Sequence, residues 1–152
     1  MYPIQLNLSH KCVAIIGGGR IALRKFNKLQ AYDVGRVIVI SPHIDKGFYE
    51  HCSTRTEFRQ KAYEAEDIKD ADLIFIATND VDVNNQVAQD AMPHQWVNHT
   101  GDRTQSDFYN MATTTCHDVQ ISMHSDGQNA PLVKQRIAQF RAMCNEINEG
   151  ED

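Results

Sequence analysis

Three consecutive glycines, Gly17, Gly18 and Gly19, are the residues whose spacing points most directly to chemistry. They follow the apolar run 13–16 and precede a stretch with helical spacing that contains the small residue Ala22. In this order Gly17 allows a sharp turn and Gly19 lets the backbone approach a pyrophosphate, whose charge is met by free N–H groups at the helix N-terminus. The pattern predicts a dinucleotide-binding turn, with a purely structural tight turn as the alternative.

Other candidates for cofactor binding lie within this turn or where later predicted strands end. Ligands bind at the carboxyl ends of strands in open α/β sheets. Ser41 stands where an NAD site usually has an acid for the ribose hydroxyls, and the run 78–80 suits a helix N-cap as well as a ligand. The predicted cofactor-binding residues are Gly17, Gly18, Gly19, Arg20, Ile21, Ala22, Ser41, Pro42, Thr78, Asn79 and Asp80.

The composition is that of an ordinary soluble globular protein. The chain has 152 residues, of which 41% are hydrophobic and 23% charged, and its formal net charge is −5. An acidic chain without a basic stripe disfavours a nucleic-acid partner. No signal-peptide pattern and no bilayer-length apolar run is found, so we expect no membrane association and a cytoplasmic location. Four cysteines without a C-x-x-C pair predict reduced thiols rather than a disulfide framework or a zinc site.

The apolar pattern predicts an α/β fold: a Rossmann-like parallel five-stranded sheet followed by a small β-β-α dimerisation segment. The expected strands are 12–16, 36–40, 57–59, 73–77 and 95–98, with helices at 20–31 and 81–91. Two β segments, 108–115 and 118–123, then precede a helix over 132–147, whose candidate buried residues are Leu132, Ile137, Phe140, Met143 and Ile147.

Two domains follow from this pattern. Residues 1–110 are expected to form the dinucleotide-binding domain, and residues 111–152 the dimerisation segment. A tail of two strands and a helix is too small to hold its own core, so we expect it to complete that core against a second subunit, as a homodimer.

Taken together, several segments resemble the precorrin-2 dehydrogenase family, which includes the N-terminal module of siroheme synthase. The resemblance covers nearly the whole chain, and its parts occur in the family's order. They are VAIIGGGRIALRK at 13–25, ADLIFIATND at 71–80 followed by Asn84, Asn98 with Asp107 and Phe108 beyond it, and the segment from Ile121 and Ser122 through Ser125 and Gly127 to Pro131.

The resemblance implies an NAD-dependent oxidation of precorrin-2, a tetrapyrrole that carries many carboxylates, to sirohydrochlorin. Some relatives also insert ferrous iron, and most carry a further small helical domain, which we expect to be absent here because the sequence ends at Asp152. Arg24 and Lys25 match the family pattern. The sequence supports equally a role as ligands and a place as solvated residues of the helix. Substrate-binding candidates are Asn98, Ser125, Lys134 and Arg136.

The catalytic position is where this chain departs from the family. Hydride loss needs a base, and the family's aspartate three residues after the Asn of the fifth strand corresponds to Gly101. The neighbouring Asp102 and His99 are the catalytic candidates, and no metal site is expected from the histidine spacing. The alternatives are a catalytically impaired nucleotide- or tetrapyrrole-binding relative with a regulatory role, and a nucleotide-sensing domain of a transport regulator.

Overall fold

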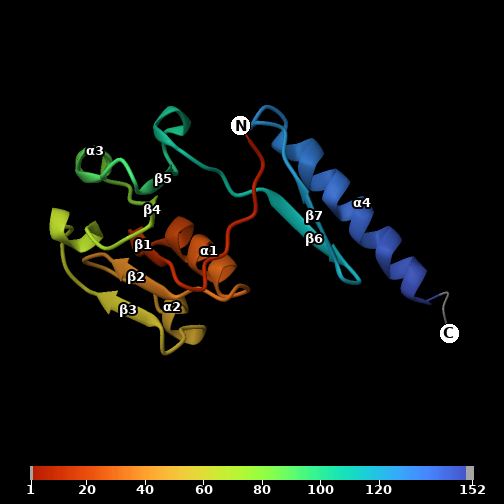
Figure 1. Ribbon diagram of the computed structural model, residues 1–152, viewed down its shortest axis with the longest axis horizontal. Helices are drawn as coiled ribbons and strands as arrows, with labels where there is room; N and C mark the ends of the chain where they lie inside the picture. The colour runs from red at the N-terminus through yellow and green to blue at the C-terminus, as the bar shows by residue number, and fades with distance from the viewer. Residues whose placement is uncertain (1, 150–152) are drawn as a thin grey trace. The chain divides into compact units, whose positions relative to one another are not determined.

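The computed structural model describes residues 2–149, with side chains through Cys144, and divides them into two compact units. The first unit runs from Tyr2 to Phe108, and the second begins at Tyr109. Figure 1 labels the α-helices and β-strands of both units.

The first unit is built on five parallel strands in the order β3-β2-β1-β4-β5, which confirms the predicted Rossmann-like fold. Parallel neighbours need crossover connections, and helices α1 and α3 make two of them. The strand order reverses between β1 and β4, and such a switch point is where open α/β sheets bind ligands. The elements are β1 (Cys12–Ile16), α1 (Arg20–Leu29), β2 (Arg36–Ile40), β3 (Thr56–Arg59), β4 (Leu73–Ile76), α3 (Val81–Asp90) and β5 (Trp96–His99).

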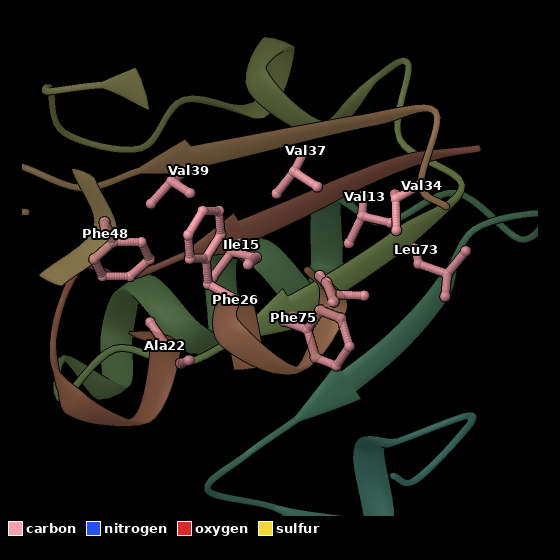
Figure 2. Close-up of a cluster of buried hydrophobic side chains, with 12 residues drawn as sticks. Val13, Ile15, Ala22, Phe26, Val34, Val37, Val39, Phe48, Leu73 and Phe75 are labelled. Atoms are coloured by element: carbon pink, nitrogen blue, oxygen red, sulfur yellow. The ribbon is translucent and has the colours of Figure 1, made fainter. Parts of the chain in front are cut away.

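Apolar side chains cover both faces of the sheet, which explains why its central strands are almost continuously hydrophobic. On one face Val13 and Ile15 of β1 pack in a cluster with Phe26 of α1 (Figure 2). On the other face Ala14 and Ile16 belong to a second buried cluster. Burial on both sides fixes the carboxyl end of β1, where the three glycines begin.

Three short helical segments complete the first unit: α2 (Gly47–Glu50) and the 3₁₀ turns η1 (Ala65–Ile68) and η2 (Arg103–Gln105). The two 3₁₀ turns are not in the sequence prediction, since three or four residues show no apolar period. In α1 the buried residues are Ala22, Phe26 and Leu29, whereas Ile21 is 40% exposed.

The second unit is an antiparallel hairpin, β6 (Ala112–Cys116) and β7 (Val119–Met123), followed by the helix α4 (Ala130–Glu149). Of the residues expected to be buried in this helix, Ile137 is buried. Leu132, Phe140 and Met143 are exposed in the single chain, because one hairpin covers only one side of a helix. Their burial against a second subunit stays a prediction. Ile147 lies outside the residues whose side chains are described.

The expectation of four reduced cysteines is wrong for two of them, since Cys116 and Cys144 form a disulfide. These cysteines are 28 residues apart, and β6 and α4 bring their Cα atoms to 5.5 Å, within the range that a disulfide spans. Cys12 and Cys52 are free. Spacing along the chain gave no sign of the pair, because the contact depends on how the last helix returns along the hairpin.

Loss of this bond should weaken the second unit. Cross-linking a loop of this length stabilises a protein by about 3 kcal/mol, so we expect Cys116→Ala to lower the free energy of unfolding by roughly that amount and the exposed Cys52→Ala to be nearly neutral. Thiol titration of unfolded protein purified without reductant should find two reactive thiols of the four cysteines. Four thiols before reduction would show that the bond does not form in solution.

Candidate functional site

The first two glycines of the turn are required by packing. Gly17 has φ +124°, and a Cβ there would lie 2.4 Å from the carbonyl oxygen of Ala77. A Cβ on Gly18 would lie 2.0 Å from the carbonyl oxygen of His43. The turn is further held by the amide of Gly17, which donates to Ile40 O at 2.9 Å. These two glycines therefore let the loops after β2 and β4 close against the turn.

Gly19 differs, because a Cβ built on it meets no heavy atom within 4 Å among the described residues. Its φ of −94° and ψ of −171° are open to any residue. Gly19 is also the N-cap of α1, and within the described chain no side chain caps this helix and no acid stands in its first turn. The N-terminus of α1 thus carries the positive end of the helix dipole without a capping side chain among the described residues, next to the open space at Gly19. This arrangement fits the diphosphate of a dinucleotide.

At the end of β2, the Ser41 hydroxyl donates to the carbonyl of His43 at 2.9 Å, and the Gln60 side chain donates to the carbonyl of Pro42 at 3.3 Å. Ser41 and Pro42 lie beside the glycine turn because β2 pairs with β1, with Ile40 opposite Ile16. The Ser41 hydroxyl is thus engaged within its own loop.

At the end of β4, the residues Thr78, Asn79 and Asp80 form a helix cap. Asp80 is the N-cap of α3, and its carboxylate accepts from the amides of Asp82 and Val83 at 3.0 and 3.1 Å. The Thr78 hydroxyl lies 2.6 Å from Oδ1 of the buried Asn84, whereas Asn79 is exposed. Segment 78–80 therefore caps α3, and its contact with a cofactor stays a prediction.

The loop that follows β5, residues 100–107 and hereafter the β5 loop, is folded back on its own strand. The amide of Val97 donates to Asp107 Oδ2, and the amide of Asp107 donates to Val97 O, both at 2.8 Å. The amide of His99 donates to Ser106 Oγ at 2.9 Å. These bonds join the two ends of the loop and present its middle at the carboxyl end of β5.

Both predicted catalytic residues organise this loop. His99 is buried, and its Nδ1 accepts from the amides of Gly101 and Asp102 at 3.2 and 2.9 Å. With Nδ1 accepting, the neutral ring carries its proton on Nε2. Asp102 caps η2, and bonds from the Gln105 and Thr104 side chains, then from the Thr104 amide, lower its pKa to about 2. Asp102 is thus a carboxylate at neutral pH, and a weak base.

Asn98 and Lys25 meet beneath this loop. Lys25 Nζ donates to Asn98 Oδ1 at 2.8 Å and lies 5.2 Å from the ring centroid of Phe75. Asn98 is 4% exposed, and its Nδ2 donates to Phe108 O at 2.7 Å. The signal for Lys25 is visible in the sequence, since it lies three residues after Ala22 on the buried side of α1.

The charge of Lys25 should make the stability of the protein depend on pH. Burial, with smaller effects of Arg24 and Lys28, lowers its pKa from 10.5 to about 8. Between these values the unfolded chain binds more protons than the native state, so this group's contribution to the free energy of unfolding rises with pH. We expect the Tm of Lys25→Met, relative to wild type, to fall as pH increases from about 8 to 10. A pH-independent difference in Tm would contradict this.

The remaining substrate candidates lie in the second unit. Ser125 Oγ accepts from the amide of Asn129 at 2.9 Å, whereas Arg136 contacts Gln139 on the surface of α4, where Lys134 is also exposed. Among the described residues, no group of three or more His, Cys, Asp or Glu side chains is placed to hold a metal ion. None of the described helices has the length and apolar content to span a membrane.

Comparisons with known proteins agree with this geometry. A family model described as “Putative NAD(P)-binding” matches residues 4–112. The chain is 29% identical over 136 residues to “Precorrin-2 dehydrogenase” of Bacillus subtilis (strain 168), covering 89% of this chain and 83% of that protein. It is also 29% identical over 143 residues to “Probable multifunctional siroheme biosynthesis protein HemA” of Ruminiclostridium josui, covering 92% of this chain but only 28% of that longer protein.

A solved structure shares the fold. The structure of “SirC, precorrin-2 dehydrogenase” superposes with a TM-score of 0.81 at 23% sequence identity, covering 93% of this chain and 70% of that one. The similarity therefore extends over both units of the chain and is not confined to the glycine turn.

Proposed function

The chain belongs to the NAD(P)-binding family whose model spans residues 4–112, and we propose that it is a dehydrogenase that oxidises precorrin-2 to sirohydrochlorin with a pyridine nucleotide. The observation that carries the nucleotide part is the open approach at Gly19 in front of an uncapped helix. The similarity to precorrin-2 dehydrogenase along 89% of the chain supports the substrate.

When bound, the nicotinamide accepts a hydride from the substrate. The residues proposed to hold the nucleotide are those of the glycine turn, 17–22, with Ser41, Pro42 and the segment 78–80 at the ends of β2 and β4. We propose NAD rather than NADP as the cofactor, since Arg20, the first residue of α1, is the one cation among these residues for a 2′-phosphate.

For proton removal we propose Asp102 as the base, with His99 as the residue that shapes its loop. His99 accepts from the Asp102 amide and so fixes the backbone from which the carboxylate projects. The low pKa of Asp102, about 2, keeps it ionised but limits its strength as a base. The same feature favours the second candidate function, a nucleotide- or tetrapyrrole-binding relative with little turnover.

Residues of the second unit are proposed to bind the substrate and to form the dimer interface. We propose that Lys134, Arg136 and Ser125 of the second unit bind substrate carboxylates. In the first unit we propose Asn98 as a further substrate-binding residue. Exposed Leu132, Phe140 and Met143 on α4 support a homodimer formed by residues 111–152, the dimerisation segment of a chain whose first 110 residues bind nucleotide. We place this enzyme in the cytoplasm, where pyridine nucleotides are held, and insertion of iron stays a prediction.

The direct test is turnover. Purified protein mixed with precorrin-2 and NAD⁺ should yield the absorbance of sirohydrochlorin together with one equivalent of NADH. Nucleotide binding without product would favour the regulatory relative, and absence of both binding and product would contradict the proposal.

Variants of the β5 loop test the base. Asn also caps helices, so Asp102→Asn should keep η2 folded while lowering kcat by about 10²-fold and leaving the NAD⁺ Kd unchanged. A Cβ on Gly101 meets nothing closer than His99 Cε1 at 3.4 Å, so Gly101→Asp fits there and should restore part of the lost kcat in the Asp102→Asn background. An unchanged kcat in Asp102→Asn would remove Asp102 from this role.

A further inference from the structure

A side-chain relay connects α1 with the far end of the β5 loop. Lys25 Nζ donates to Asn98 Oδ1, and Asn98 Nδ2 donates to Phe108 O, at 2.8 and 2.7 Å. A lysine ammonium can only donate and a carbonyl oxygen can only accept, so an amide side chain between them satisfies both in one orientation. The relay therefore joins the helix that begins at the glycine turn to the residue that follows the loop.

The surroundings of the relay make it hard to replace. Asn98 is 4% exposed, and the Lys25 ammonium lies 5.2 Å from the centroid of Phe75. The ring of Phe75 meets that of Phe108 edge-on, with centroids 5.4 Å apart. In such an apolar setting hydrogen bonds are stronger, and a member left without its partner is costly. α1, β4, β5 and the end of the loop thus converge on one half-buried lysine.

Displacement of Phe108 would be transmitted to the loop. Phe108 directly follows Asp107, whose amide and carboxylate both bond to Val97. The next bond inward joins His99 to Ser106, and the turn closed on His99 Nδ1 carries Asp102. Each step is a short contact between neighbouring groups, so the relay is continuous from Lys25 to Asp102.

We infer that Lys25 is a positioning residue for the reaction. Through Asn98 it holds the β5 loop at a fixed position relative to the glycine turn, and so sets where Asp102 lies relative to a bound dinucleotide. This inference rests on the proposed function. A purely structural role would show in stability alone: methionine keeps the apolar stem of Lys25 but removes the donor to Oδ1 of the buried Asn98, which is costly.

The experiment compares Lys25→Met with Lys25→Arg, which keeps a charged donor, and with Lys28→Met as the matched control on the same helix. Amide hydrogen exchange of residues 100–107, the Kd for NAD⁺ and kcat are measured for each. We expect Lys25→Met to speed amide exchange of the loop about tenfold and to lower kcat about tenfold. The Kd for NAD⁺ should stay within about twofold of wild type. Lys25→Arg should recover part of both losses, and Lys28→Met should show neither.

Unchanged exchange in Lys25→Met, or faster exchange with unchanged kcat, would overturn the inference. A fall in kcat that follows a fall in Tm and is not recovered by Lys25→Arg would also overturn it, because that pattern belongs to a structural role. Asn98→Asp provides a second route: it keeps the acceptor for Lys25 but loses the donor to Phe108, and should also speed exchange. If wild type binds NAD⁺ without turnover, the proposed function fails, whereas the exchange data still report on the relay.

Discussion

Gly17→Ala should lower the free energy of unfolding by about 3–5 kcal/mol. The new Cβ would lie 2.4 Å from Ala77 O and 2.7 Å from Ala77 C, at a φ of +124° that L-residues rarely adopt. Both neighbours are backbone atoms at the end of β4, so no side-chain rotation relieves the collision. Relief requires β1 and β4 to separate where their pairing is buried.

Chemical denaturation with circular dichroism measures this effect. Gly101→Ala is the matched control, because its Cβ meets only the His99 ring at 3.4 Å or more, and it should change stability by less than about 1 kcal/mol. A Gly17→Ala protein as stable as wild type would show that the turn is not packed against β4 as described.

Gly19→Val should do the reverse: it should leave stability almost unchanged and reduce the affinity for NAD⁺ by about 100-fold. The backbone at Gly19 is extended, which suits a β-branched residue, and a Cβ there meets nothing within 4 Å of the described chain. The valine would occupy the space in front of the α1 N-terminus, through which a diphosphate must approach. A 100-fold loss corresponds to about 2.7 kcal/mol, a reasonable cost for losing several charge-assisted bonds.

Isothermal titration gives the Kd, and thermal unfolding gives the stability of the same preparation. Wild-type affinity in a folded Gly19→Val protein would mean that nucleotide, if bound, lies elsewhere. The pair is informative because two glycines of the same turn, two residues apart, are expected to differ: Gly17→Ala should lose stability, and Gly19→Val should lose binding.

The sequence was sufficient for the sheet because each strand carries its own signal. The runs at 12–16, 36–40 and 73–77 are apolar on both faces, which only the central strands of a parallel sheet require. The structure gives β1, β2 and β4 within one residue of these bounds. The order of the glycines between a strand and a helix also predicted the turn, since that geometry is set by neighbouring residues.

Contacts between residues far apart in the chain could not be predicted from the sequence. Lys25 and Asn98 are separated by 73 residues, and nothing local to either shows that the ammonium reaches the amide. The Cys116–Cys144 disulfide was missed for the same reason. Asp102 carries a cap signal of its own, but the lowering of its pKa depends on how Thr104 and Gln105 turn back on it.

Titration of isotope-labelled protein with NAD⁺, followed through the backbone amides by NMR, tests most directly whether the glycine turn binds the dinucleotide. We expect the largest shifts at Gly19, Arg20 and Ile21, with further shifts at 78–80 and in the β5 loop. Saturable binding whose shifts lie outside the glycine turn, or no shifts at millimolar NAD⁺, would contradict this expectation.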